Sequence, residues 1–160
     1  MNLFGVLSEV YPTLLTGLTM TVKITILSLI IALVIGIFVC LMNISSNIVL
    51  RGIAKFYIWL IRGTPMLVQA FYFYFALPQL IQAVTGSQFR ITVFTASLVT
   101  LALNAGAYIS EIFRGSIESV NKGQMEAARS LGLSYAKSMQ KIILPQAVRI
   151  LSLIHISEPT

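Results

Sequence analysis

The chain has 160 residues, of which 57% are hydrophobic and only 10% are charged, and its formal net charge at pH 7 is +6. Soluble domains carry about 25% charged residues. Because the apolar residues here also come in long runs, the composition excludes an ordinary soluble domain and indicates an all-α polytopic membrane protein. The only cysteine, Cys40, has no partner for an internal disulfide, so we expect it to fill a small space in the core.

Three uncharged apolar stretches are long enough to cross a membrane, which takes about 20 residues. The first predicted span covers residues 24–42 and follows a semi-apolar segment, 13–21, that we expect to lie at the membrane interface. The second covers 65–84 and is expected to bend near Pro78. The third covers 91–110.

A four-residue motif marks the start of the second span. Gly63 is expected to break the preceding helix, Thr64 to act as the N-cap, and Pro65 to occupy the first helical position, where its missing N–H costs nothing. Arg62 precedes them and completes the motif.

Polar side chains inside the second and third spans have two interpretations, which the sequence leaves open. A lone amide in a span usually bonds a neighbouring helix, and a glycine such as Gly106 usually marks a close helix approach. The same side chains could instead line a substrate path. These candidates are Gln69, Tyr72, Asn104 and Tyr108.

The distribution of Lys and Arg predicts the orientation. Of the 11 basic residues, all but Lys23 and Arg90 follow the first or the third span, and basic residues concentrate on the cytoplasmic side. The N-terminus is therefore expected outside, and residues 111–149 are expected to form a cytoplasmic loop. In that loop Glu111, Arg114 and Glu118 would share one helix face and pair with each other.

The stretch "GQMEAARSLGLS" predicts a short soluble helix after the third span. Gly123 leads into a helix over Gln124–Leu131, Gly132 is placed to end it, and Ser134 is placed to cap a second helix. The two helices would form a knob at the membrane surface.

The surface of this knob suits a partner protein. Ala127 and Ala128 would leave a smooth face for close approach, and Met125, Ala128 and Leu131 could form an apolar stripe. The residues alone equally allow a solvated loop between spans.

The residue pattern of the knob resembles the EAA loop of ABC-importer permeases. It has Glu126-Ala127-Ala128, then Gly132, then Ile142, Leu144 and Pro145 at the spacing of that motif. The stretches "RGTPMLVQ", "AYISEIFRGSIESVNKGQ" and "GLTMTVKITILS" are similar to the polar amino-acid branch of the same family. The resemblance covers residues 11–150.

The resemblance implies a permease subunit that imports polar amino acids across the bacterial inner membrane. Such permeases pair as homo- or heterodimers, bind two ATPase subunits in the cytoplasm, and receive substrate from an extracytoplasmic solute-binding protein. The implied ATPase interface on this chain consists of Gly123, Glu126, Ala127, Ala128 and Gly132. Any ATP and Mg²⁺ would be held by the partner ATPase, so no cofactor is expected on this chain.

Other classes of function lack the residues they need. The sequence has no G-x-x-x-x-G-K-[ST] loop for nucleotide. It has no Asp, and its one histidine, His155, lies in the tail discussed below, so we expect no Ser-His-Asp triad, no His-based metal site and no enzyme. A secondary transporter or channel would favour ionisable residues inside the spans, which are absent away from their ends. A permease for another polar solute, such as an opine or an organosulfur compound, stays open.

The last ten residues, "LSLIHISEPT", resemble the translation of a sequencing-library adapter. We therefore expect 151–160 to be a non-native tail, His155 to have no role, and residues 1–150 to contain three of five spans. A chain lacking two spans is expected not to transport.

Overall fold

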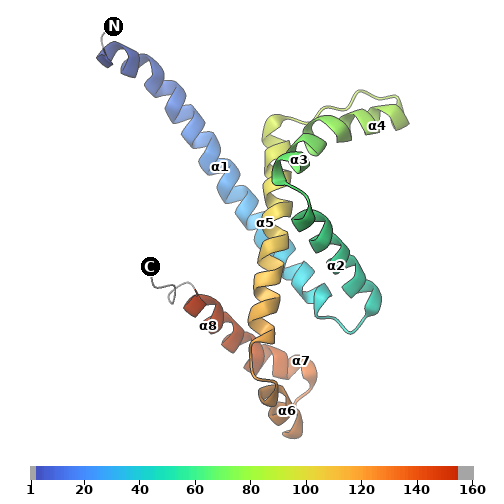
Figure 1. The fold of residues 1–160 in the computed structure, drawn as a ribbon. Coiled ribbons are helices and arrows are strands. Elements are labelled where there is room, and N and C mark those ends of the chain that lie inside the picture. Colours follow the sequence, from blue (N-terminus) through green and yellow to red (C-terminus); the bar gives the residue numbers. More distant parts are fainter. Residues whose placement is uncertain (1–2, 155–160) are drawn as a thin grey trace.

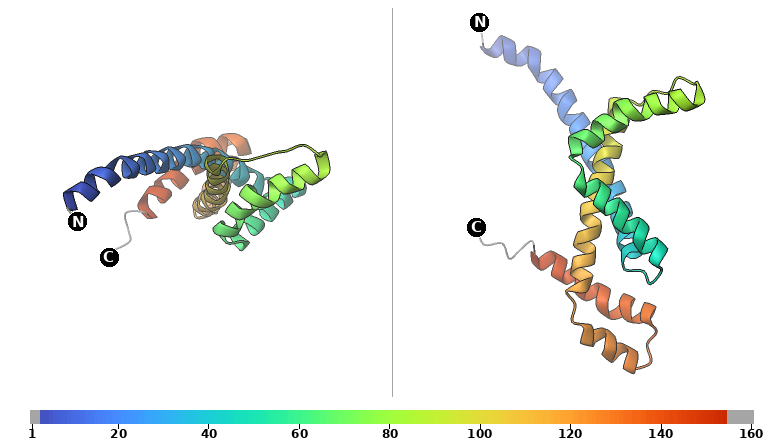
Figure 2. Two further views of the ribbon diagram at one scale, coloured as in Figure 1. Left: turned by 90° about the horizontal axis from the view of Figure 1, so that it is seen from above. Right: turned by 45° about the vertical axis from the view of Figure 1, so that its right-hand side comes forward.

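The computed structural model describes residues 3–154, and it describes the surroundings of side chains for residues 10–151. All regular elements in these residues are helical, so the predicted all-α class is confirmed (Figures 1 and 2). Residues 155–160, most of the expected tail, lie outside this range. The elements are α1 (Leu3–Asn43), α2 (Ile48–Gly63), α3 (Met66–Phe71), the π-helix η1 (Tyr72–Ala76), α4 (Leu77–Thr85), α5 (Val93–Glu118), α6 (Lys122–Ser130), α7 (Tyr135–Ser138), the π-helix η2 (Met139–Ile143) and α8 (Leu144–Ile154).

Three segments are long and apolar enough to cross a membrane: Val10–Asn43, Met66–Thr85 and Val93–Glu118. The segment 13–21, which we expected at the membrane interface, is continuous with the first predicted span, because α1 is one helix of 41 residues. Its threonines explain this. Thr16 and Thr19, and likewise Thr21 and Thr25, donate their hydroxyl to the carbonyl four residues earlier, at 2.8–2.9 Å. They so bring no unsatisfied polar group into an apolar segment.

The crossing of α1 and α5 is the most extensive helix contact among the described residues (Figure 1). Two glycines, one on each helix, leave room for an isoleucine side chain of the other helix. A Cβ at Gly36 would lie 2.5 Å from Cγ2 of Ile109, and a Cβ at Gly106 would lie 2.8 Å from Cγ2 of Ile35. The predicted close approach at Gly106 is therefore confirmed.

Small residues continue this seam on both helices at a spacing of four, which places them on one face. Large side chains are excluded there because the backbones lie too close, as is usual where helices pack in a membrane. Cys40 is buried in the seam, as expected. The seam consists of Ala32, Gly36 and Cys40 on α1 and Ala102, Gly106 and Ser110 on α5.

The helix α2 was not predicted as an element. It is amphipathic: Ala54, Ile58 and Ile61 are buried, while Trp59 is exposed. The hydroxyl of Tyr57 donates to the carbonyl of Leu103 at 2.6 Å and fixes α2 to α5. Figure 1 shows α2 and then α3 leading along α5, whereas α4 turns away from it.

The two π-helices have a common cause. Proline cannot donate to the helix ladder and its ring collides with the carbonyl four residues earlier, so a helix must bend or widen there. Pro78 and Pro145 each follow the end of a π-helix by two residues, and Leu77 and Leu144 donate to the carbonyl five residues earlier. The expected distortion near Pro78 therefore takes the form of a wider turn.

We predict that Gly36→Ala lowers the thermal unfolding midpoint in detergent. The new methyl group meets Cβ of Ile109 at 2.9 Å, so the helices must separate, which costs about 1–3 kcal/mol. Trp59, the only tryptophan, reports unfolding by its fluorescence. Gly17→Ala on the same helix meets nothing within 4 Å and should leave the midpoint equal or higher. Equal midpoints for the two variants would rule out the packing described.

Candidate functional site

The short helix α6 is defined at both ends by turn chemistry. At its start the Asn121 side chain accepts a hydrogen bond from the Gly123 N–H at 2.8 Å. At its end the Gly132 N–H donates to the carbonyl of Arg129 at 3.0 Å, and the Leu133 N–H donates to that of Ala128 at 3.2 Å. This pair of bonds is a Schellman motif, which requires a left-handed residue. Gly132, at φ +82°, provides it as predicted.

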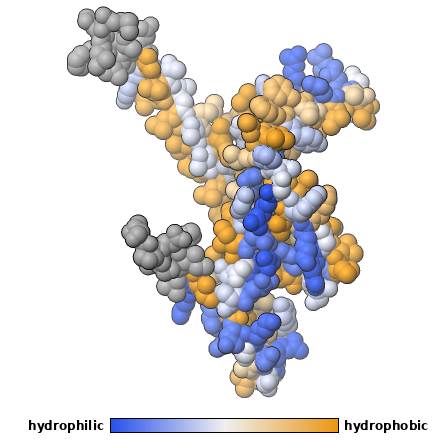
Figure 3. All heavy atoms as spheres, in the orientation of Figure 1, coloured by the Kyte–Doolittle hydropathy of each residue, from blue (hydrophilic) through white to orange (hydrophobic). Residues whose placement is uncertain are grey.

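The chain then returns through α7, η2 and α8, which form a base for α6. Ser134 caps this segment by accepting from the Lys137 N–H, as predicted. Val120 at the end of α5 packs with Ile143 and Ala147 in a small hydrophobic core, and Met125 of α6 contacts it. We call α6, α7, η2 and this core the knob. It stands at the hydrophilic end of the molecule (Figure 3).

The predicted interface residues divide between two faces of α6. Gly123, Glu126, Ala127 and Gly132 are exposed. Ala128 is only 2% exposed, because α6 packs this face against its own base. The prediction that Ala128 offers surface to a partner is therefore wrong. The predicted apolar stripe of Met125, Ala128 and Leu131 is also split between the two faces, because Met125 packs against the base.

Leu131 lies at the tip of the knob and is 83% exposed. A single exposed apolar side chain is ordinary at a protein surface. The outward face of the knob therefore combines Glu126, Ala127 and Leu131, which is a carboxylate beside a small and a large apolar group.

A network of charged side chains lies between the knob and the helix crossing. Arg114 binds both oxygens of Glu111, at 2.9 and 3.0 Å, and also pairs with Glu118. The predicted pairing on one helix face is confirmed. These residues belong to α5 itself, which continues beyond residue 110, the end of the predicted span, to Glu118.

The sequence did not predict that Glu111 also joins the other helices. Arg62, the last basic residue of α2, approaches its carboxylate at 3.5 Å, and Asn43 at the end of α1 donates to it at 3.3 Å. The ends of α1 and α2 thus meet α5 at one carboxylate, although Asn43 and Arg62 lie 68 and 49 residues from Glu111 in the sequence. Only a three-dimensional contact could reveal this.

The amides among the predicted substrate-path residues bond each other. Gln69 is 6% exposed, and its Nε2 donates to the carbonyls of Ile61 and Thr64 and to the hydroxyl of Thr64, at 2.7–3.0 Å. Its Oε1 accepts from Asn104 at 3.3 Å. Both amides are therefore used to join α2, α3 and α5, which is one of the two interpretations that the sequence allowed.

The break between α2 and α3 differs from its prediction in one detail. Thr64 does not cap α3. It is the C-cap of α2, where its hydroxyl donates to the carbonyl of Leu60, and Pro65 takes the N-cap position of α3. The reason is that Gln69 reaches back and occupies the Thr64 oxygen.

The two predicted tyrosines are each 46% exposed. Tyr108 lies under the guanidinium of Arg62, 5.0 Å from its centre, and Tyr72 lies in η1 with its ring edge against Phe73. The Tyr72 backbone N–H donates to the carbonyl of Gln69. In the residues that the structure describes, no group of three or more His, Cys, Asp or Glu side chains could hold a metal.

We predict that Gln69→Ala lowers the unfolding midpoint, because it leaves the buried carbonyl of Ile61 without its donor. An unsatisfied buried group costs about 1–3 kcal/mol. Tyr72→Phe removes a hydroxyl from an exposed side chain and should change the midpoint little. The comparison is made by thermal unfolding in the same detergent. If Tyr72→Phe proves the more damaging change, the bonding role given to Gln69 is incorrect.

We predict that Gly132→Ala loosens the end of α6, because φ +82° is strained for a side chain. Gly132→Asn should be milder, since asparagine tolerates the left-handed region better. Amide hydrogen exchange at Leu133 measures the effect, with about fivefold faster exchange expected for alanine, on the basis of roughly 1 kcal/mol. Equal exchange in both variants would contradict the role assigned to this turn.

Comparisons with known proteins place this geometry in a family. Residues 32–154 match the model of the binding-protein-dependent transport system inner membrane component. The arginine transport system permease protein ArtQ of Bacillus subtilis is 44% identical over 88% of this chain and 62% of its own length. The nopaline transport system permease protein NocM of Agrobacterium fabrum is 40% identical over 88% of this chain and 60% of its own. The chain thus spans about three fifths of these relatives.

A solved structure supports the same placement. The crystal structure of an amino acid ABC transporter with histidines includes a chain that is 36% identical to this one and superposes with a TM-score of 0.80, over 97% of this chain and 78% of that chain. The family model, which matches residues 32–154, covers the helix crossing and the whole knob. The chain therefore belongs to the family of inner membrane components of binding-protein-dependent transport systems.

Proposed function

We propose that this chain is part of the permease subunit of an ATP-driven importer for polar amino acids, and that α6 is where a separate ATPase subunit docks. One observation carries the docking proposal. The inner face of α6, with Ala128, is packed on the chain's own base, whereas Glu126, Ala127 and Leu131 face outward. A packed inner face and an open outer face are what a helix needs to receive a partner and pass on its motion.

The connection from α6 to the membrane supports a mechanical role. Val120 joins the knob core to α5, and α5 runs without a break from there to the glycine crossing with α1. ATP binding would close a pair of ATPase subunits, move the two knobs of a permease pair, and rock the spans between inward-open and outward-open states. Such coupling requires contacts that differ between the two states.

The orientation and partners belong to the same proposal. The knob faces the cytoplasm and the N-terminus lies outside, as the basic residues indicate. A second permease subunit and an extracytoplasmic solute-binding protein complete the importer. Hydrolysis of ATP belongs to the ATPase partner, since this sequence has no phosphate-binding loop.

The substrate class rests on what the relatives are named for. An arginine permease and a permease matched in an amino-acid transporter with histidines favour a polar amino acid. The nopaline relative keeps an opine as the second candidate. Because Gln69 and Asn104 already bond each other, we propose that the half-exposed Tyr72 and Tyr108 are the better candidates for contact with a solute.

The docking proposal predicts that Ala127→Leu weakens binding of the ATPase subunit. The ATPase used is that of the amino-acid importer from the same organism. Replacing a methyl by an isobutyl group on a close-fitting face costs about 1–3 kcal/mol, which is a rise in Kd of roughly fivefold to more than a hundredfold. Ala136→Leu is the matched control, because Ala136 is also exposed on the knob but lies on α7. Binding is measured between the purified subunits in detergent.

Two results would count against the proposal. If Ala127→Leu and Ala136→Leu bind the ATPase subunit with the Kd of the unchanged chain, α6 is not the docking element. If both variants lose binding equally, the contact lies elsewhere on the knob. The experiment measures docking alone, so it does not depend on whether the chain transports.

A further inference from the structure

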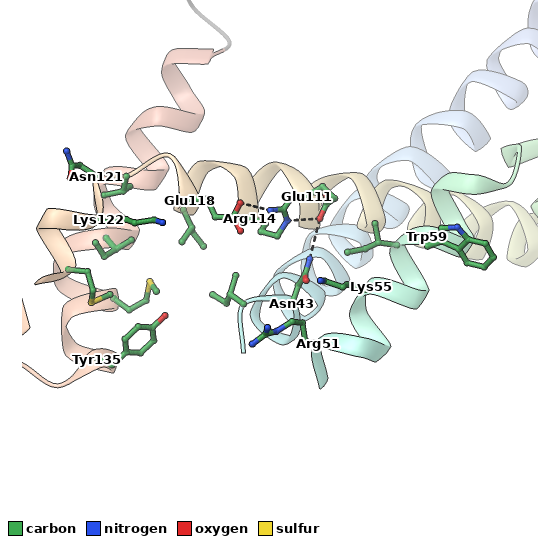
Figure 4. Close-up of a pocket in the computed structure, with 17 residues that line it drawn as sticks. Asn43, Arg51, Lys55, Trp59, Glu111, Arg114, Glu118, Asn121, Lys122 and Tyr135 are labelled. Carbon is green, nitrogen blue, oxygen red and sulfur yellow. Dashed lines mark hydrogen bonds and ion pairs between the residues drawn. The ribbon is translucent and has the colours of Figure 1, made fainter. Parts of the chain in front are cut away.

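A cleft of about 1000 Å³ lies between α2, the last turns of α5 and the knob (Figure 4). Arg51 and Lys55 of α2 stand on one side of it, and Lys122 and Tyr135 of the knob stand on the other. The proposed docking of an ATPase uses the outward face of α6 and leaves this cleft unassigned. The remaining walls are largely apolar and include Ile44, Ile58, Ile117, Val120, Met125, Met139 and Ile143.

The acidic groups of the cleft are already paired. Arg114 binds both Glu111 and Glu118, and Arg62 adds a further cation to Glu111. Among the described residues, by contrast, no carboxylate pairs with Lys55 or Lys122. The cleft therefore has a surplus of positive charge at its lysines.

On the α2 side of the cleft, the basic side chains lie beside a tryptophan. Arg51, Lys55 and Trp59 follow one another at a spacing of four, so they lie on one face of α2. Arg51 donates to the carbonyl of Ser45 at 2.9 Å, which holds it at the start of the helix. Tryptophan concentrates at the level of lipid headgroups, with basic residues beside it. The exposed Trp59 thus places the mouth of the cleft at headgroup depth.

We propose that this cleft binds an anionic glycerophospholipid from the leaflet next to α6, with the headgroup phosphate between Lys55 and Lys122 and an acyl chain against the apolar walls. The combination of charge and apolar lining decides for a lipid. A free phosphate would gain nothing from the partly exposed apolar side chains of Ile44, Ile117 and Met125. A zwitterionic lipid would bring a second cation to the lysines. Only the identification of this leaflet as cytoplasmic rests on the proposed function.

Trp59 makes the proposal measurable, because it is the only tryptophan and lines the cleft one turn from Lys55. The chain is placed in phosphatidylcholine nanodiscs that contain a small fraction of lipid with brominated chains, either phosphatidylglycerol or phosphatidylcholine. Bromine quenches a nearby indole. We expect brominated phosphatidylglycerol to quench half of the accessible fluorescence at a mole fraction roughly 25-fold lower, since each of the two lysines near a lipid surface contributes about fivefold.

The double variant Lys55→Gln with Lys122→Gln tests the site itself. Both lysines are exposed, so the fold should be retained, and the preference for phosphatidylglycerol should fall below about twofold. The matched control is Lys137→Gln with Lys141→Gln, which removes two exposed lysines of the knob that do not line the cleft. The control should keep the preference.

Three results would overturn the proposal. Equal quenching by the two brominated lipids would mean that ordinary surrounding lipid, or a protein segment, covers the cleft. Equal loss in both double variants would mean a general surface charge effect. Loss of the preference when inorganic phosphate replaces chloride at equal ionic strength would mean that the ligand is a soluble anion. No ATPase subunit is present, so failure here leaves the docking proposal intact, and failure of docking leaves this result unaffected.

Discussion

The crossing of α1 and α5 sets the position of every other element. At Gly36 and Gly106 the two helices approach so closely that each glycine receives an isoleucine of its partner. A membrane offers no hydrophobic gain for bringing two apolar helices together, so close contact of this kind must supply the attraction. Once α5 is fixed against α1, its length carries the knob away from the crossing, and its side presents Leu103 and Asn104 to α2 and α3.

The carboxylate of Glu111 lies two residues beyond Ile109 and depends on that crossing. Charged groups near apolar surroundings are costly unless paired, and removing one partner of such a set usually costs more than the pair contributed. Here Asn43, Arg62 and Arg114 bring the ends of α1 and α2 to the same carboxylate on α5. A shift of the knob that turns α5 must therefore either carry these ends along or break the network.

The sequence predicted features that depend on neighbouring residues, but it did not predict contacts between distant segments. The left-handed turn at Gly132 and the capping by Ser134 follow from neighbouring residues and were correct. The helix α2 escaped because Arg51, Lys55 and Arg62 interrupt its hydropathy, although its amphipathic period is regular. Ala128 is buried and Gln69 bonds the carbonyl of Ile61 because each meets a partner from another segment. The pattern of a single segment cannot predict such contacts.

The knob also shows why α6 can be so short. A helix of nine residues is not stable alone in water, because nucleation costs more than so few hydrogen bonds return. Its stability must come from the caps at both ends and from Met125 and Ala128 packed on the base. That base exists because Pro145 widens the return helix at η2 without ending it, which keeps Met139 and Ile143 in one continuous support. A force on the outer face of α6 is therefore met by a packed core and passes to α5 through Val120.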